Sequence, residues 1–175
     1  NTHFDWKYAP PQWKSLRAVR VLFCLLIITA CLAGAASAAG FSGGDGSSGS
    51  PYLISSESDL QQLATEVNSG TYADSTYFKL TQDIVLANEW TPIGTSAYPF
   101  KSTFDGAGNT ISGLLIKQTG DSNLYLGLFG QSNGGTIKNL NVAGKIEGTS
   151  SLNIYAGGLV GDIIGGQIEN CSSNV

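Results

Sequence analysis

The sequence LGLFG at residues 126–130, followed by GGTIKNL at residues 134–140, occurs twice in this chain. It returns at an offset of 31, without a gap, as GGLVG at 157–161 followed by GGQIENC at 165–171. Self-similarity at a fixed period of about 20–50 residues is typical of solenoids, propellers and repeat arrays. Each unit holds only short apolar runs broken by glycine. The repeat therefore predicts coils of β-strand that stack along one axis and bury their apolar faces against each other.

A weaker third copy, GNTISGLLI at residues 108–116, matches residues 134–142 at an offset of 26. It places Gly113, Asn139 and Asn170 in one column, and glycine and asparagine share a tolerance of left-handed backbone. We expect the coil to bend at this column. Two interpretations of the asparagines stay open, a hydrogen-bonded ladder along the axis or ordinary turn residues.

The composition favours flat, repetitive β-structure. Charged residues make up 13% of the chain, against about 25% in an average globular protein. Residues 1–38 carry a net charge of +3, and residues 39–175 carry −7. An acidic body without a basic patch excludes nucleic acid as an expected partner.

Residues 1–38 are typical of a basic region followed by a secretory signal peptide. Lys14, Arg17 and Arg20 precede an apolar run at 21–32, and a stretch of small residues at 33–40 contains the A-x-A sequence at 36–38. Two alternatives stay open. One is an uncleaved anchor, although the run is shorter than the roughly 20 residues of a spanning helix. The other is lipidation at Cys31, within a lipobox-like sequence. Secretion to the exterior or the cell surface is the expected localisation, with membrane contact only through this leader or a lipid at Cys31.

The two ends of the chain indicate a fragment. No methionine is present, residues 1–13 precede the basic region and are possibly not native coding sequence, and the chain stops just after the repeat motif at 157–173. We expect the array to be truncated after Val175.

The segment between leader and repeats divides into two parts. Residues 39–50 are a glycine–serine sequence that predicts a flexible linker. Residues 51–70 predict a short strand and an amphipathic helix, with apolar side chains at positions 60, 63, 64 and 67, a capping sequence from Ser56 to Asp59, and Gly70 as terminator. We expect this helix to cover one end of the solenoid, because an uncovered end would expose strand edges.

Residues 71–175 are expected to form the coils, with clear repeats at 126–142 and 157–173. The predicted core consists of the apolar residues of the strands: Phe78, Leu80, Ile84, Leu86, Ile93, Phe104, Ile111, Leu114, Ile116, Leu128, Phe129, Ile137, Leu140, Val142, Ile146, Leu159, Val160 and Ile168.

These sequences resemble the GLUG repeat. The match rests on the two passages above, on the WTPIG sequence at 90–94, on FDGAGNTISGL at 104–114, and on the PYLI sequence at 51–54, and it covers about residues 51–175. The resemblance implies a right-handed parallel β-helix in a microbial secreted or surface protein. Such proteins include adhesin-like proteins, and the repeat also occurs in the non-catalytic region of IgA-specific metallopeptidases.

A search for reactive groups predicts no catalytic, metal or cofactor site. The only histidine, His3, precedes the leader, which excludes a His-based zinc site or catalytic triad in the body. Cys171 occupies the column of Leu140, so we expect a packing role. The aspartates at positions 83, 105, 121 and 162 are isolated from each other. Trp90, Tyr98 and Phe100 are an aromatic platform for a sugar or, as we favour, packing residues.

Three functions stay open at this point. The favoured one is a structural or adhesive surface scaffold that contacts a host or environmental surface through a glycan or protein ligand, with loops 118–125 and 148–155 as the candidate contact regions. The second is the non-catalytic front end of a secreted metallopeptidase. The third is a polysaccharide lyase or epimerase, which requires clustered charges. The five lysines of the body are dispersed, and it contains no arginine.

Overall fold

A computed structural model describes residues 40–72 and 74–175. The described chain is mostly β-structure: a parallel β-solenoid of about four turns with one short helix that precedes the coils. This confirms the predicted fold class. The predicted leader and Cys31 lie outside the described residues. The strands are β1 (Tyr52–Ile54), β2 (Tyr77–Leu80), β3 (Ile84–Val85), β4 (Thr103–Asp105), β5 (Thr110–Gly120), β6 (Leu124–Leu126), β7 (Phe129–Ser132), β8 (Thr136–Lys138), β9 (Asn141–Ser150), β10 (Ile154–Ala156), β11 (Val160–Ile163), β12 (Gln167–Glu169) and β13 (Ser172–Asn174), and helix α2 (Glu57–Asn68) follows β1.

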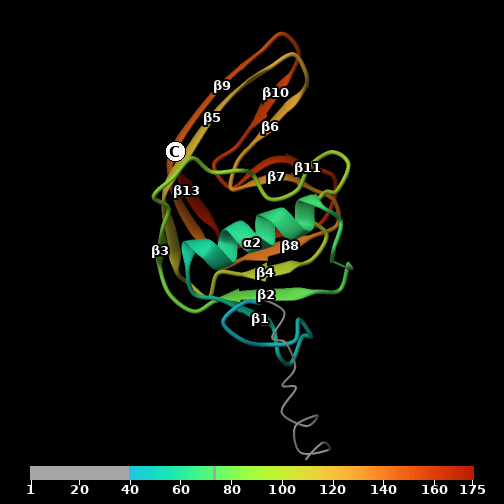
Figure 1. Cartoon of the computed structure of the whole chain (residues 1–175), viewed down its shortest axis with the longest axis vertical. Helices are drawn as coiled ribbons and strands as arrows, with labels where there is room; N and C mark the ends of the chain where they lie inside the picture. The colour runs from blue at the N-terminus through green and yellow to red at the C-terminus, as the bar shows by residue number, and fades with distance from the viewer. Residues whose placement is uncertain (1–39, 73) are drawn as a thin grey trace, which may run out of the picture. The chain divides into compact units, whose positions relative to one another are not determined.

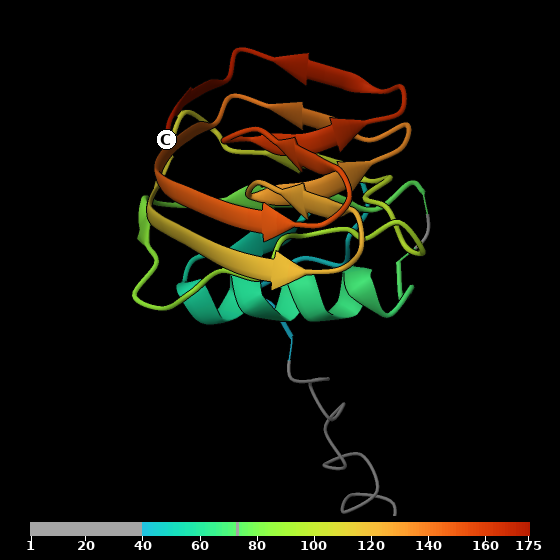
Figure 2. The same ribbon diagram turned by 90° about the horizontal axis from the view of Figure 1, so that it is seen from above.

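Four parallel sheets form the walls of the solenoid. Their strand orders are β1-β2-β4-β8-β12, β3-β5-β9-β13, β7-β11 and β6-β10, so each strand pairs with the equivalent strand of the next coil. Figure 2 shows the coils stacked on one another, with α2 at one end of the stack and β12 at the other. The arrangement arises because each coil has too few apolar residues to form a core alone and must bury them against its neighbours.

The register confirms the gapless repeat in three of these sheets. Val160 pairs with Phe129, Ile168 pairs with Ile137, and Ser172 pairs with Asn141. The prediction that residues 108–116 are a third copy of the repeat, equivalent to residues 134–142 at an offset of 26, is wrong. Thr136 pairs with Thr103, and the strand containing Ile111 pairs with β9. The similarity of residues 108–116 to 134–142 joins strands from different walls, because both walls need the same alternation of apolar and polar residues.

Gly113 lies at a β-bulge and not at the corner predicted for it. Between the pairs Ile111–Val142 and Leu114–Gly144, strand β5 holds one residue more than β9. Gly113 has a φ of +73°, and a Cβ there would stand 2.5 Å from the carbonyl oxygen of Leu86. Only glycine fits this left-handed position so close to a neighbouring backbone.

The two asparagines of the predicted column do form a ladder. Asn139 and Asn170 have φ values of +52° and +51° at successive corners. Asn170 Nδ2 donates to Asn139 Oδ1 at 3.3 Å, and Asn139 Nδ2 donates to Asp105 Oδ1 at 3.0 Å. The ladder interpretation is therefore confirmed for Asn139 and Asn170, and Asp105, which pairs with Lys138 one position before this column, accepts the next hydrogen bond in place of Gly113.

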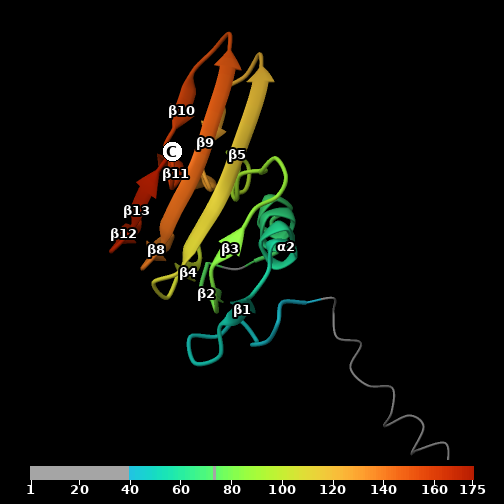
Figure 3. The same ribbon diagram turned by 90° about the vertical axis from the view of Figure 1, so that its left-hand side faces the viewer.

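Helix α2 begins and ends at the predicted signals. Ser56 Oγ accepts a hydrogen bond from the Asp59 amide at 3.2 Å, which satisfies an N-terminal donor. The helix ends at Asn68, and Gly70 follows with a φ of +76°. Its four apolar side chains, at 60, 63, 64 and 67, are buried in the core. Figure 3 shows the helix beside β3 and β5.

The glycine–serine segment 40–50, whose composition predicts a linker, is hydrogen-bonded to the first coils. The amide of Leu53 donates to the Gly43 carbonyl at 2.8 Å, and the amide of Tyr77 donates to the Gly46 carbonyl at 2.9 Å. Phe41 packs against Tyr52 and Phe78, with ring centroids 4.9 and 5.6 Å away. This part of the chain therefore belongs to the folded body.

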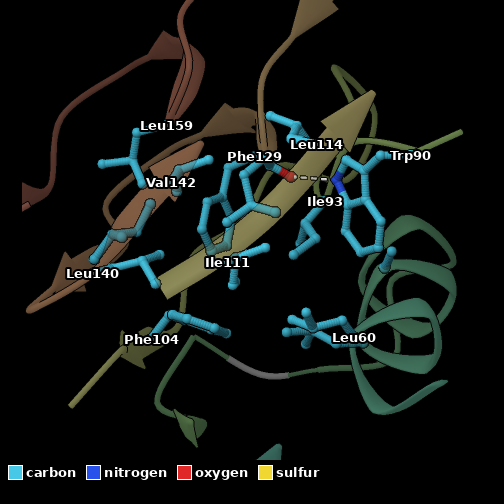
Figure 4. Packing of buried hydrophobic residues seen from close by; sticks show 14 of the residues in the cluster. Leu60, Trp90, Ile93, Phe104, Ile111, Leu114, Phe129, Leu140, Val142 and Leu159 are labelled. Atoms are coloured by element: carbon cyan, nitrogen blue, oxygen red, sulfur yellow. Dashed lines mark hydrogen bonds between the residues drawn. The ribbon is translucent and has the colours of Figure 1, made fainter. Parts of the chain in front are cut away.

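The core runs along the axis and is covered least at the last coil. Figure 4 shows Phe129 at its centre, with Ile111, Phe104 and Trp90 around it. Of the predicted core, Ile146 and Val160 are only partly buried and Ile168 is 45% exposed. The placement of Ile168 in the core is thus wrong for this structure. Its column is interior, but no later coil of the described chain covers it.

Candidate binding surface

The most distinctive surface of the solenoid is a lobe formed by two adjacent coils. Strands β5 and β9 are the longest in the described chain, and they run side by side beyond the other walls before the chain returns along β6 and β10 (Figures 1 and 3). We call residues 115–126 and 145–156 the lobe. Within the lobe, Leu124 and Leu126 of the earlier coil are buried, whereas Leu152, Ile154 and Tyr155 of the later coil are exposed. The lobe contains both loops that the sequence marks as candidate contact regions.

The turns at the tip of the lobe are connected by side-chain hydrogen bonds. Ser150 Oγ donates to the Ser122 carbonyl at 2.7 Å and accepts from the Leu152 amide at 3.0 Å. Asn153 Nδ2 donates to Asn123 Oδ1 at 3.4 Å. These bonds hold the two turns one above the other and so fix the backbone from which the side chains of the lobe project.

Two tyrosines stack on the face of the lobe. Tyr125 on β6 pairs with Tyr155 on β10, and their rings lie 5.1 Å apart at an angle of 11°. Tyr155 is 37% exposed and Tyr125 is half-buried. A parallel pair covers one face of each ring and leaves the opposite face to other contacts.

A groove of about 300 Å³ lies beside Tyr125. One wall is the lobe, with Gln118, Asn123 and Tyr125, and the other wall is the loop of residues 91–96. Asn68 at the end of α2 holds this loop, because its Nδ2 donates to the Pro92 carbonyl at 3.1 Å and its Oδ1 accepts from the Gly94 amide at 2.7 Å. The helix thus fixes the second wall of the groove.

The residues that line the groove carry no formal charge. They are Asn68, Thr91, Pro92, Gly94, Thr95, Ser96, Gln118, Ser122, Asn123, Leu124 and Tyr125. Amides, hydroxyls and one aromatic ring are suited to hydrogen bonding and stacking. Sequence reasoning marked the loops but missed the tyrosine stack, because at an offset of 31 Tyr125 faces Ala156.

The aromatic platform considered for Trp90, Tyr98 and Phe100 does not form. Trp90 and Phe100 are buried, and the Trp90 indole Nε1 donates to the Leu128 carbonyl at 2.9 Å, the dashed line of Figure 4. Tyr98 alone is exposed, at 48%. It lines a separate cavity of about 170 Å³ beside the exposed ion pair of Lys101 and Asp74. The favoured expectation, packing, holds for two of the three residues.

The four aspartates singled out by the sequence all serve local structure. Asp83 accepts from the Thr110 amide at 2.7 Å, Asp121 from the Ser151 hydroxyl at 3.3 Å, and Asp162 from the Gln131 amide group at 2.7 Å. Asp105 accepts from Asn139 Nδ2 in the ladder. They are not gathered into one site.

Asp105 is the most strongly held of these carboxyls. Partial burial acts to raise its pKa, but the hydrogen bonds from Asn139 and the Ala107 amide, together with the Lys138 ammonium 3.8 Å away, outweigh burial and lower the pKa below 3.8. This ionised carboxylate begins the asparagine ladder.

Cys171 is a packing residue. Cys171 occupies the position in the last coil that Leu140 occupies in the coil before, as the hydrogen bond from the Ser172 amide to the Leu140 carbonyl shows. Its side chain packs against the core. Burial raises the pKa of its thiol above 9.0, so the thiol is protonated at neutral pH and a poor nucleophile. Within residues 40–72 and 74–175, no three histidine, cysteine, aspartate or glutamate side chains come close enough together to hold a metal ion.

Comparison with known proteins gives no relative. Protein-family models, curated proteins and solved structures were all searched, and none matches this chain. In the described part of the chain, no helix combines the length and apolarity needed to cross a membrane. The strand register and the packing of the described residues define this part of the chain as a parallel β-solenoid.

Proposed function

We propose that this chain is a non-catalytic scaffold from a secreted or cell-surface protein of the GLUG-repeat type, and that its solenoid presents the lobe to an external surface. The observation that carries this proposal is how the polar side chains of the described residues are used. The aspartates, the ladder asparagines and the cysteine serve turns, strand corners and packing, whereas the groove between the lobe and the loop of residues 91–96 is lined by uncharged side chains. Such a surface suits binding better than a reaction.

The leader sequence supports export. A basic region followed by the apolar run at 21–32 is the pattern that secretion machinery recognises. The GLUG resemblance supports the same location through the two glycine-flanked motifs. The observed parallel register of successive coils is consistent with a repeat protein that extends by adding further coils. The expected partner is a glycan or protein on a host or environmental surface.

Export can be tested with a reporter fused after Val175 of the full chain. Alkaline phosphatase is active only where its disulfides form, outside the reducing cytosol. We expect activity from the wild-type fusion and its loss in Leu26→Arg, because a charge in the apolar run opposes recognition. Ser15→Arg is the matched control, since it adds the same charge within the basic region and preserves activity. Equal activity of the two variants, or an inactive wild-type fusion, would contradict export.

Adhesion has a separate readout. Beads coated with the purified chain should be retained under flow on glycan-coated or protein-coated surfaces, and beads coated with urea-unfolded chain should not. Equal retention of both bead types would refute an adhesive role for the folded lobe.

A further inference from the structure

We propose that the groove beside Tyr125 binds a neutral oligosaccharide, with one pyranose ring against the free face of Tyr125. The inference rests on the proposed adhesive function and names its ligand class. It combines three observations: an aromatic ring held in a fixed stack, a groove at the edge of that stack, and a lining of amides and hydroxyls without charge.

The stack determines which face of Tyr125 is available. Tyr155 belongs to the later coil and covers the face of Tyr125 on that side, at a centroid distance of 5.1 Å. The groove lies towards the earlier coil, since its second wall is the loop of residues 91–96, and Ile93 in that loop pairs with Phe129. A sugar ring bound in the groove would lie against Tyr125 as a third ring of the stack that Tyr155 and Tyr125 form. The C–H groups of a pyranose carry partial positive charge and fit the electron-rich face of an aromatic ring.

The polar groups of the groove are placed for hydroxyl recognition. Across the described residues, the side chains of Gln118 and Ser96 have no hydrogen-bond partner and are available to a ligand. Asn123 accepts hydrogen bonds from Asn153 through Oδ1, which leaves its Nδ2 to donate. Asn68 is already committed to the loop. The groove volume of about 300 Å³ lies at the lower end of the range of roughly 300–1,000 Å³ for small-molecule sites.

The absence of charge in the lining excludes the acidic sugars as the preferred class. A uronate or sulfated sugar would bring an anion into a groove whose lining has no lysine or arginine, against a body of net charge −7. A polysaccharide lyase that acts on acidic substrates needs basic side chains in its binding groove, and the lining of this groove has none.

A peptide strand fits the same place less well. Leu124 and Leu126 on β6 bond to the β10 side, through Asn153 and Gly157, so Tyr125 is the one residue of this short strand whose backbone groups point away from β10. Strand addition relies on a row of main-chain hydrogen bonds. A single residue cannot supply that row, and the side-chain lining favours a sugar.

Calorimetric titration of the full chain with neutral oligosaccharides tests the inference. The probes are oligomers of glucose, galactose, mannose, xylose and N-acetylglucosamine, with oligogalacturonate and an extended peptide as contrasts. We expect one neutral series to bind. Tyr125→Ala should weaken it by about tenfold or more, whereas Tyr125→Phe, which keeps the ring face, should stay within about threefold of wild type.

Two further variants separate binding from folding. Tyr98→Ala removes another exposed tyrosine, outside the groove, and should leave the affinity unchanged. Gln118→Ala removes only a side chain that bonds to no other described residue. Gln118→Ala should weaken binding several-fold while its far-UV circular dichroism spectrum stays that of wild type. This second variant keeps the inference testable if Tyr125→Ala misfolds. Failure of every neutral oligomer to bind, tighter binding of oligogalacturonate or of the peptide, or a loss of affinity in Tyr98→Ala equal to that in Tyr125→Ala would overturn the inference. None of these results bears on export, which the phosphatase fusion tests separately.

Discussion

The sharpest prediction compares two isoleucines that occupy the same column of the solenoid. Ile137 and Ile168 pair directly across β8 and β12. Ile137 is 0% exposed, between the coil of Phe104 and the coil of Ile168, whereas Ile168 is 45% exposed. The two substitutions Ile137→Ala and Ile168→Ala remove the same atoms from the same backbone position, so each is the control for the other.

The expected magnitudes follow from burial. Replacing a fully buried isoleucine by alanine costs about 2–5 kcal/mol, because the transfer energy of the lost atoms is joined by the energy of the cavity left behind. Complete burial of such a side chain is worth about 1.5–3 kcal/mol. For the half-exposed Ile168 this leaves a loss of about 1 kcal/mol, with no closed cavity. We therefore expect Ile137→Ala to lower the free energy of unfolding by at least about 1–2 kcal/mol more than Ile168→Ala.

Urea titration followed by far-UV circular dichroism and by tryptophan fluorescence measures both values. The two probes test whether unfolding is a single transition, which repeat proteins do not always show. The slope with urea should be unchanged, so that a shift in midpoint reports stability. Losses within about 0.5 kcal/mol of each other, or a larger loss for Ile168→Ala, would refute the stacking argument, since they would give the covered and the uncovered coil the same environment.

Two further predictions concern the asparagine ladder. Asn139→Ala should cost about 1–2 kcal/mol more than Asn139→Gly by urea titration, because both variants lose the bonds to Asp105 and Asn170 but only alanine is strained at a φ of +52°; equal costs would show that the backbone there is unstrained. Because the folded-state pKa of Asp105 lies below its usual 3.8, this carboxylate stabilises the fold above pH 3.8 and loses that contribution as the pH falls through the lowered value. Stability measured from pH 6 down to pH 3 should therefore fall less steeply in Asp105→Asn than in wild type, and parallel curves would contradict the role given to Asn139 and Lys138.

The solenoid, its helix and the ladder could be predicted from the sequence because each depends on a local requirement repeated at a fixed interval. Left-handed corners favour asparagine or glycine, although Ala107 adopts a φ of +53° in this chain, and Asn139 and Asn170 recur at the period of the repeat. The helix could be located from Ser56 and Gly70, which satisfy its ends. These signals are short-range and need no knowledge of which strands pair.

Burial could not be predicted in the same way. Ile168 lies in a repeat like that of the interior Ile137, and its exposure depends only on whether a further coil covers it. The third copy failed for a related reason. Thr110 and Ile111 match Thr136 and Ile137 in residue type, but strands of different walls share the same alternation, so residue similarity does not identify the wall.

The tyrosine stack depends on a single inserted residue. At an offset of 31, Ile116 would face Glu147 and Tyr125 would face Ala156. The bulge at Gly113 shortens the offset to 30 through the lobe, so that Ile116 faces Ile146, Lys117 faces Glu147 and Tyr125 faces Tyr155. Each of these pairs joins side chains that stabilise a sheet, apolar with apolar, cation with anion and aromatic with aromatic.

The same comparison shows how the lobe could have been found from the sequence. A second alignment at an offset of 30 matches Ile116 to Ile146 and Tyr125 to Tyr155, and its boundary falls at a glycine, the residue that a bulge often requires. A one-residue slip transfers every side chain of a strand to the opposite face. The bulge at Gly113 is therefore what aligns the two tyrosines beside the groove, and the position of the proposed binding surface follows from the local backbone geometry of one residue in β5.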